Sequence, residues 1–352
     1  MLNHLFQFSI DILTCPATSP AGWLTCSCNL WLNSFMTEFN SLYTELTREQ
    51  IDQTSRAIKK RGVRESDYDL IQGLSSCLGY LGQYGVSSGD QENQKRIVQL
   101  FDWLFKSSDY GLPNGLIKNN NIIDEDRKRY FTKGYVNLGL SHGFAGPLAA
   151  LSTIPNTQAL GTVLNFYEKL FYQNRQANTP WTSEVSFQNL IQNDFKVLGG
   201  ERASWCYGNP GIARAVFEGA KLQNNQLLME TAVNYFLSLK SLDFDDLQLK
   251  SPTICHGISG LLLILNAMER DTGLREIGLI KQRILARLLS VADFEKKLVF
   301  MEYDMVFRGK RYDTPGYFND IGLLNGSGGI VLTLMSLQSK QRLDWERILL
   351  VS

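Results

Sequence analysis

Two of the chain's three histidines and two of its six cysteines stand beside glycines at matching places. His142 and His256 each directly precede a glycine, and Cys206 and Cys255 each come two residues before one. Thiolate sulfur and imidazole nitrogen are the protein ligands that zinc prefers. Imidazole also titrates near pH ~6.5, which suits proton transfer at neutral pH. These four side chains therefore indicate a metal site, acid–base catalysis, or both.

Cys206, Cys255 and His256 together make a Cys₂His ligand set. Three nitrogen or sulfur ligands with a fourth position left open are typical of catalytic zinc, whereas structural zinc is held by four ligands. The two cysteines lie 49 residues apart, so their spacing alone is weak evidence for a shared ion. The alternative is that both cysteines are buried core residues and that the histidine is hydrogen-bonded within a turn.

Three further polar residues are candidates for the same site. His142 would act as a fourth ligand, as a proton carrier, or as a hydrogen-bonded structural histidine. Arg202 precedes Cys206 by four residues, about one helical turn, and would either stabilise developing negative charge or pair with a neighbouring carboxylate. Asp69 comes just before a glycine turn and would either face the site or cap a helix.

A fivefold repeat of glycine turns would position these residues. Each copy opens an apolar run, and the copies begin at residues 73, 143, 208, 257 and 326. Four copies have a second glycine three residues later, and the first copy has Ser76 in that place. Glycines at i and i+3 share one helical face and allow close backbone approach. Units of this length have room for a helix pair, and they must stack to bury their apolar faces.

The repeat predicts two layers of helices. The runs after the glycines are apolar nearly all round, which is typical of fully buried helices. The segments between them mix apolar stripes with charge and predict outer helices over residues 158–176, 221–242 and 277–291. Alternating inner and outer helices predict an all-α fold, an α/α toroid with the glycine turns gathered at one end. Turn-rich residues 106–135 predict a small insertion with room for short strands.

Composition and charge narrow the class of protein. The 352 residues are 44% hydrophobic, and 35 basic residues balance 35 acidic ones, so no basic surplus argues for nucleic acid. Residues 1–35 hold one acidic residue, Asp11, and no basic one, so we expect a boundary near Met36 between an N-terminal extension and a domain over 36–352. Prolines or glycines interrupt both long uncharged stretches, at 12–37 and 134–167, so neither predicts a membrane helix. We expect a cytoplasmic protein.

The motifs around His142, Cys206 and Cys255 resemble those of the LanC-type lanthionine synthetases, the lantibiotic cyclases. They are Asn137-Leu-Gly-Leu-Ser-His142-Gly-Phe-Ala-Gly146-Pro, Trp205-Cys-Tyr-Gly-Asn-Pro-Gly211 and Cys255-His-Gly-Ile-Ser-Gly260. Leu324-Asn-Gly-Ser-Gly-Gly329-Ile resembles the last glycine turn of the family. The resemblance covers residue 36 to the end and implies an α/α toroid, often with a small inserted subdomain. It also implies one zinc ion held by Cys206, Cys255 and His256, in an active site lined by His142, Asp69, Arg202 and Tyr207.

The family resemblance implies a zinc-dependent cyclisation. A cysteine thiolate of a dehydrated ribosomal precursor peptide would add to dehydroalanine or dehydrobutyrine and form a (methyl)lanthionine ring. His142 would protonate the α-carbon, and Asp69 would take up the thiol proton or position His142. Arg202 and Tyr207 would hold the enolate oxygen. The implied partners are the precursor peptide and, in a membrane-associated complex, a dehydratase and an exporter.

Other functions stay open on the sequence alone. One is a glutathione- or thiol-binding relative without cyclase activity, and another is a toroidal peptide-binding scaffold with zinc structural or absent. A toroidal glycosidase would need a pair of carboxylates at the rim, and only Asp69 stands near a glycine turn. The aromatic stretch 300–318 is a candidate peptide-binding rim, although a packed outer loop is the favoured interpretation.

Overall fold

The computed structural model describes residues 25–108, 111–155, 157–175, 179–196, 202–307 and 310–351, with side chains from residue 35 onward. The predicted N-terminal extension, with His4 in it, lies outside the described residues except for the backbone of 25–34. Helix α2 (Thr25–Arg61) runs through position 36 without a break. The boundary expected near Met36 therefore falls inside a helix, and a division of the chain there stays a prediction.

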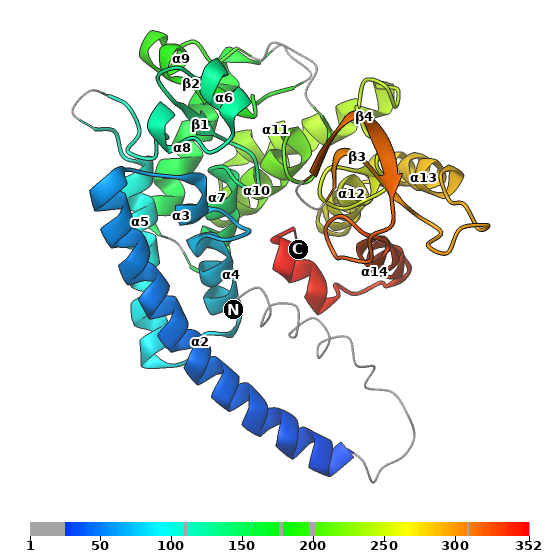
Figure 1. The fold of residues 1–352 in the computed structure, drawn as a ribbon, viewed down its shortest axis with the longest axis horizontal. Coiled ribbons are helices and arrows are strands. Elements are labelled where there is room, and N and C mark those ends of the chain that lie inside the picture. The colour runs from blue at the N-terminus through cyan, green and yellow to red at the C-terminus, as the bar shows by residue number, and fades with distance from the viewer. Residues whose placement is uncertain are drawn as a thin grey trace.

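Two layers of helices form the body of the protein, as the repeat predicted (Figure 1). The inner helices follow the five glycine turns and pack one on the next: α4 (Leu74–Tyr84), α7 (Ala145–Leu151), α10 (Asn209–Leu222), α12 (Ile258–Thr272) and α14 (Ser327–Gln338). The outer helices alternate with them: α2, α5 (Ser88–Phe105), α8 (Gln158–Gln173), α11 (Gln226–Ser238) and α13 (Arg275–Ser290). The all-α, toroidal prediction is confirmed, with two small sheets added.

The ends of the outer helices differ from the predictions where the chain turns. Lys221, predicted to open an outer helix, belongs to the last turn of inner helix α10, and α11 starts only after the cap residue Asn225. The amide of Leu228 donates to the Asn225 side chain, and Thr157 caps α8 in the same way. A 3₁₀ turn, η2 (Leu239–Ser241), then extends α11 to the predicted end.

Close backbone contact explains the second glycine of each turn. A methyl group on Gly146, Gly211, Gly260 or Gly329 would lie 1.8–2.8 Å from the carbonyl oxygen of the residue six positions earlier. No real Cβ atom approaches an oxygen so closely, so the chain can fold back over the helix start only where that atom is missing. The first turn is looser and has Ser76, whose hydroxyl donates to the Gly73 carbonyl at 2.9 Å.

Gly208 is the most constrained of the turn glycines, and its replacement should destabilise the fold. Its φ is +105°, and an added Cβ would lie 1.8 Å from the Arg202 carbonyl oxygen. We expect Gly208→Ala to lower the free energy of unfolding by about 2–6 kcal/mol, from backbone strain and overpacking. Gly161→Ala in α8, where nothing lies within 4 Å of the added atom, should raise it by about 0.5–1 kcal/mol. Urea unfolding measures the stability of both variants, and equal unfolding midpoints would contradict the expected strain at Gly208.

A chain of backbone hydrogen bonds joins the glycine turns into one rim. The amide of Leu70 donates to the Ser141 carbonyl at 2.9 Å, and that of Ser141 to the Cys206 carbonyl at 3.2 Å. Cys206 donates in turn to Cys255 at 3.0 Å, and Cys255 to Leu324 at 2.9 Å. These bonds hold the residues just before each inner helix side by side. The rim is therefore a fixed backbone frame from which the predicted site residues project.

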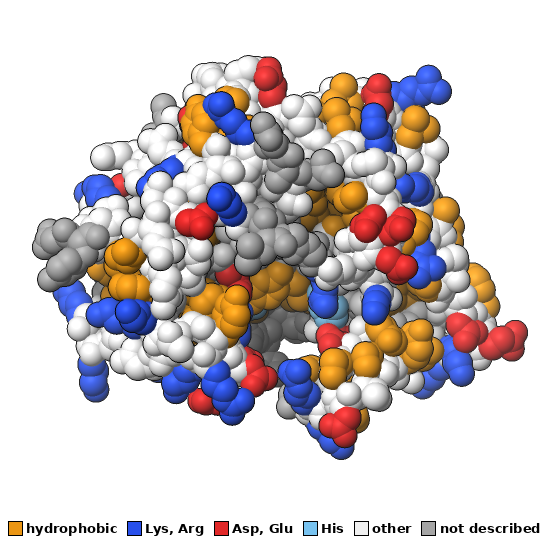
Figure 2. Space-filling model, turned by 90° about the horizontal axis from the view of Figure 1, so that it is seen from above, with side chains coloured by type: hydrophobic (Ala, Val, Ile, Leu, Met, Phe, Trp, Pro, Cys, Tyr) orange, Lys and Arg blue, Asp and Glu red, His pale blue; other side chains and the backbone are white. Residues whose placement is uncertain are grey.

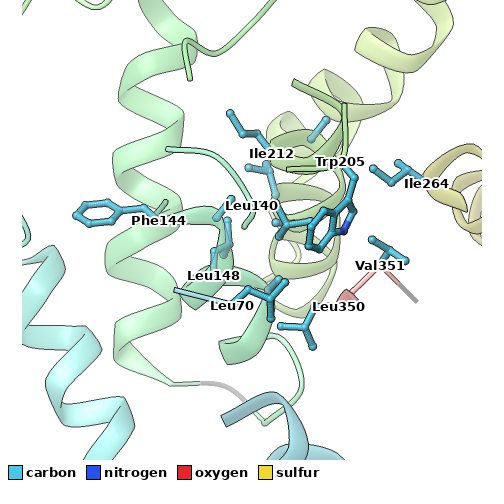
Figure 3. Packing of buried hydrophobic residues seen from close by; sticks show 14 of the residues in the cluster. Leu70, Leu140, Phe144, Leu148, Trp205, Ile212, Ile264, Leu350 and Val351 are labelled. Atoms are coloured by element: carbon cyan, nitrogen blue, oxygen red, sulfur yellow. The ribbon is translucent and has the colours of Figure 1, made fainter. Parts of the chain in front are cut away.

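The C-terminal segment packs into the centre of the toroid (Figure 3). It comprises η3 (Asp344–Leu349) and the buried residues Leu350 and Val351. The indole of Trp205 donates to the Leu349 carbonyl at 3.3 Å, and the fully buried Arg214 donates to the Val351 carbonyl at 2.7 Å. The segment thus fills the core beneath the rim with apolar side chains, and it ties inner helix α10 to the end of the chain.

Two additions lie on the same side of the toroid (Figure 1). The first contains α3 (Glu65–Tyr68), η1 (Asn119–Asn121), α6 (Glu125–Tyr130), α9 (Phe187–Gln192) and the antiparallel strands β1 (Tyr135–Asn137) and β2 (Glu184–Ser186). The second is the antiparallel hairpin of β3 (Glu302–Phe307) and β4 (Lys310–Phe318), where a packed outer loop was predicted. None of the described helices combines the length and hydropathy that crossing a bilayer requires.

Candidate functional site

His142 and Asp69 meet across the first two glycine turns. The Nδ1 atom of His142 lies 2.6 Å from Oδ2 of Asp69. The other carboxylate oxygen, Oδ1, accepts from the backbone amides of Ile71, Gln72 and Gly73 at 3.1, 2.6 and 2.8 Å. Asp69 therefore does both things that the sequence left open, since one oxygen caps the turn and the other faces the site. The turn holds the carboxylate still, and the carboxylate orients the imidazole.

The environment of His142 favours its charged form. Burial opposes a charge on the ring, but the hydrogen bond that the ring donates to Asp69, and the negative charge of Asp69, outweigh that cost and raise the pKa of His142 above its usual value. The Asp69 side chain is only 3% exposed, whereas that of His142 is 34% exposed. The pair is thus arranged as a buried carboxylate that supports an accessible imidazole, which is the arrangement of a proton carrier.

Cys206 and Cys255 form the second pair, on the third and fourth turns. The two thiols are close enough for each to shift the pKa of the other. The interaction with Cys255 lowers the pKa of Cys206 to about 7, against the opposing effect of burial. The same interaction, with burial, raises the pKa of Cys255 well above its usual range. Cys206 is therefore the more acidic of the two thiols, and two neighbouring sulfurs suit a thiophilic cation.

The imidazole of His256 contacts a carboxylate from the hairpin. Its Nε2 atom lies 3.0 Å from Oδ2 of Asp304, yet this buried nitrogen has no well-directed hydrogen bond in the described part of the chain. A ring nitrogen of His256 and the carboxylates of Glu302 and Asp304 lie within 4.8 Å of one another, whereas the described residues show no such grouping of His256 with both thiols. The structure thus brings the thiol pair together and holds the third predicted ligand beside them, turned to Asp304.

Glu302 is the third member of the group that contains His256 and Asp304. Its side chain is 4% exposed, and burial together with the charges of Asp304 and Asp320 raises its pKa to about 7. Only Asp69 was predicted near a glycine turn, but Glu302 and Asp304 also approach one, at His256. The available signal was the pair of acids at positions 302 and 304, because residues two apart on a strand face the same side. Their approach to His256 depends on the hairpin folding back, which the sequence did not show.

Tyr207 lies between the two pairs and is held by Arg127 of the first addition. Its ring centre is 5.9 Å from that of His142, and its hydroxyl accepts from Nη1 of Arg127 at 3.4 Å. The Arg127 guanidinium also lies 4.7 Å from the centre of the Tyr135 ring, whose hydroxyl donates to Glu65 at 2.6 Å. Burial and the charge of Glu65 raise the pKa of Tyr207 to about 12, so the phenol keeps its proton. Arg127 is a second contributor that the sequence did not reveal.

Two cavities open beside these groups. The insertion pocket, of about 340 Å³, is lined by Asp69, His142, Glu65 and Arg127 among others. The hairpin groove, of about 630 Å³, runs from Arg202 and His256 between residues 244–251 and the hairpin. Figure 2 shows a hollow in this face, with a histidine at its margin between basic side chains.

Arg202 occupies the junction of the groove and the thiol pair. It is exposed, it precedes helix α10 in a non-helical segment rather than on the predicted helical turn, and its charge lowers the pKa of Cys206. All seven predicted site residues therefore lie along one rim. Their chemical roles stay predictions.

Comparison with known proteins agrees with this arrangement. The sequence model of the family described as lanthionine synthetase C-like protein matches residues 34–350. The protein named "Nisin biosynthesis protein NisC" from Lactococcus lactis subsp. lactis is 25% identical over an alignment of 268 residues, and the match covers 72% of this chain. The chain spans 62% of that relative's length. The solved structure named "Nisin cyclase" superposes with a TM-score of 0.70 at 22% identity, over 91% of this chain and 74% of that one, so it shares the toroidal fold. The chain belongs to the lanthionine synthetase C-like family.

Proposed function

We propose that the protein forms thioether rings in dehydrated peptides, by adding a cysteine sulfur to the β-carbon of a dehydroamino acid. The observation that carries this proposal is the pairing of His142 with Asp69 beside the paired thiols of Cys206 and Cys255, all on consecutive turns of one rim. The first pair can hold and deliver a proton, and the second can bind a thiophilic cation. Family membership and the relatives' names support the same reaction.

Cys206, Cys255 and His256 would hold one zinc ion. The fit rests on the chemistry of the donors: two neighbouring cysteine thiols, one with its pKa lowered to about 7, and the imidazole of His256 next to Cys255 in the chain. Zinc, when bound, supplies the acidity that deprotonates a coordinating peptide thiol near neutral pH. Asp304 contacts Nε2 of His256 and so leaves Nδ1 as the ring nitrogen for the ion, in the manner of carboxylates that orient metal-binding histidines.

His142 delivers the proton that completes the addition. When the peptide sulfur bonds to the β-carbon, the π electrons of the alkene move onto the carbonyl and leave an enolate. The α-carbon then takes one proton, which the His142 imidazolium donates while Asp69 holds the ring in place. The proton released by the peptide thiol balances the one consumed, so the mass of the peptide does not change.

Tyr207 and Arg202 stabilise the negative charge of the enolate oxygen. The phenol of Tyr207 keeps its proton at neutral pH, lies against His142 and is half-buried, so it is a preformed donor. Arg202 adds positive charge near both thiols, whose pKa values it lowers. Donors that are already in place when charge develops contribute the largest electrostatic share of catalysis.

Deuterium incorporation tests the proposed reaction. The probe is a synthetic peptide with one dehydroalanine and one cysteine a few residues away, incubated with the zinc-loaded protein in D₂O. We expect a thioether that carries one deuterium at the α-carbon in a single configuration, because one face of the enolate meets His142. A mixture of both configurations, formed no faster than without protein, would overturn the proposal.

Asp304 should tune zinc affinity although it is not one of the proposed ligands. We expect Asp304→Asn to weaken zinc binding by about 10–100-fold, the usual cost of losing an outer carboxylate on a metal-binding histidine. The matched control is Asp313→Asn on the exposed part of β4, which should leave the affinity unchanged. Competition with a chromogenic chelator measures both variants. An unchanged affinity in Asp304→Asn would show that His256 is oriented in another way.

We also propose where in the cell, and at which stage, this protein meets its peptide. We expect the precursor peptide to reach this protein after a dehydratase has acted and before an exporter removes it, in a cytoplasmic complex that lies at the membrane through these partners. A thiol-binding relative without cyclase activity would also use the thiol pair, but it would have no need for the His142–Asp69 pair. That pair is therefore the observation that favours the cyclase.

A further inference from the structure

The hairpin groove carries more positive than negative charge in a chain whose formal net charge is zero. Four basic residues line it, against two acidic ones: Arg202, Lys250, Arg287 and Arg311, with Asp245 and Asp304. One of the acids, Asp304, already contacts His256. The groove thus presents an excess of cations next to the proposed metal site.

These cations have no ion-pair partner in the part of the chain that the structure describes. None of the four has a carboxylate at ion-pair distance there, whereas Arg61, Arg96, Arg214 and Arg270 elsewhere do. Arg287 lies over the ring of Phe244, 5.5 Å from its centre, and its buried Nε has no hydrogen-bond partner in the described region. An arginine guanidinium that has no carboxylate partner can bind one through two parallel hydrogen bonds.

The remaining wall of the groove suits a peptide. Tyr303, Met305, Val306 and Pro315 of the hairpin line it with apolar surface, and the Tyr303 ring is braced by Tyr317 at 4.9 Å between centres. A volume of about 630 Å³ lies within the range of pockets that enclose small molecules or short peptide segments. Apolar walls with a few fixed charges give both affinity and orientation.

We propose that the hairpin groove binds an acidic segment of the peptide substrate, and that this segment guides the neighbouring cysteine to the thiol pair. The inference rests on the proposed function, because the occupant is the peptide whose cysteine reacts. Arg202 and His256 line the same groove as Arg287 and Arg311, so a peptide whose carboxylates pair with those two arginines lies beside the proposed metal site. Sequences with Asp or Glu beside the reacting cysteine are the preferred substrates.

Binding of matched peptides tests the groove directly. The probes are two fluorescein-labelled decapeptides that carry one cysteine, the first with three aspartates beside it and the second with three asparagines. Fluorescence anisotropy with the zinc-loaded protein should give at least tenfold tighter binding of the acidic probe. Raising NaCl from about 50 to 500 mM should remove most of that difference, because screening weakens exposed ion pairs.

Two double variants test whether Arg287 and Arg311 cause the preference for the acidic probe. Arg287→Gln with Arg311→Gln should abolish the preference for the acidic probe, whereas Arg129→Gln with Arg275→Gln removes the same charge at exposed positions outside the groove and should preserve it. Equal affinity of the two probes, or equal behaviour of the two double variants, would overturn the proposal. So would complete displacement of the acidic probe by citrate at equal carboxylate concentration, since the site would then bind any small anion. Salt titration of the unmodified protein keeps the test valid if a variant fails to fold.

The groove proposal and the cyclase proposal can be contradicted separately. If thioether rings form from acidic and neutral peptides alike, the groove proposal is wrong and the cyclase proposal stands. If the acidic probe binds selectively but no ring forms, the groove proposal stands and the cyclase proposal is wrong.

Discussion

Replacing Cys206 with alanine is expected to remove both the bound zinc and the ring-forming activity. Cys206 is the more acidic member of the thiol pair, with a pKa of about 7, and its loss leaves only the partly buried Cys255 thiol, whose pKa is raised. Zinc measured by plasma emission should fall from one ion per chain to a trace. Activity should fall by more than the 10–100-fold that accompanies loss of an outer-shell partner.

Cys77→Ala is the matched control for this experiment. Cys77 is also a buried cysteine at an inner helix, but it lies in α4, where its sulfur contacts Gln50 at 3.5 Å. Burial raises the pKa of Cys77, so it stays a neutral thiol and has no role as a ligand. This variant should keep its zinc and its activity. A Cys206→Ala protein that still binds one zinc ion would refute the proposed ligand set.

His142→Asn should separate proton transfer from metal binding. The variant loses the imidazole that Asp69 orients, so cyclisation should slow by about 10²–10⁴-fold, the range for removing a general acid. The zinc content should stay at one ion per chain, because His142 lies with Asp69 rather than in the thiol pair. Loss of zinc together with activity would instead make His142 a fourth ligand. Full activity would show that another group protonates the α-carbon.

The pH dependence provides a second measure of the same residue. Asp69 raises the pKa of His142, so the donating imidazolium persists to higher pH than a free histidine, and activity should decline as pH rises through this raised value. Asp69→Asn should move that decline to lower pH. Because the folded-state pKa is the higher one, the pair stabilises the fold fully below the unfolded value of about 6.5 and loses this contribution as pH rises through the folded value. An unchanged decline would remove Asp69 from its positioning role.

The glycine turns made most of the fold predictable from the sequence. Gly146, Gly211, Gly260 and Gly329 each permit a contact with a backbone carbonyl six residues earlier, and this contact repeats because each inner helix starts in the same way. The regular spacing of glycine and apolar residues therefore encodes both the inner helices and the rim. The residues just before the glycines are placed on that rim by the same geometry, which is why the site residues could be named.

The sequence could not show the contacts between elements far apart in the chain. Asp304 reaches His256 only because the hairpin folds back over the rim, and Arg127 reaches Tyr207 across 80 positions through the insertion. Neither contact has a local pattern, because a salt bridge or a hydrogen bond depends on tertiary approach rather than on periodicity. The contact of His256 with Asp304 is likewise set by the fold of the hairpin and not by the motif around His256.

The most direct test of the cyclase proposal is the fate of the peptide thiol. A synthetic peptide with one dehydroalanine and one cysteine is incubated with the zinc-loaded protein, alkylated, and weighed by mass spectrometry. The proposed reaction predicts that the thiol becomes resistant to alkylation while the peptide mass stays the same, and that Cys206→Ala protein leaves it reactive. A peptide that binds to the protein but remains fully alkylated would contradict the cyclase and identify a thiol- or peptide-binding protein instead.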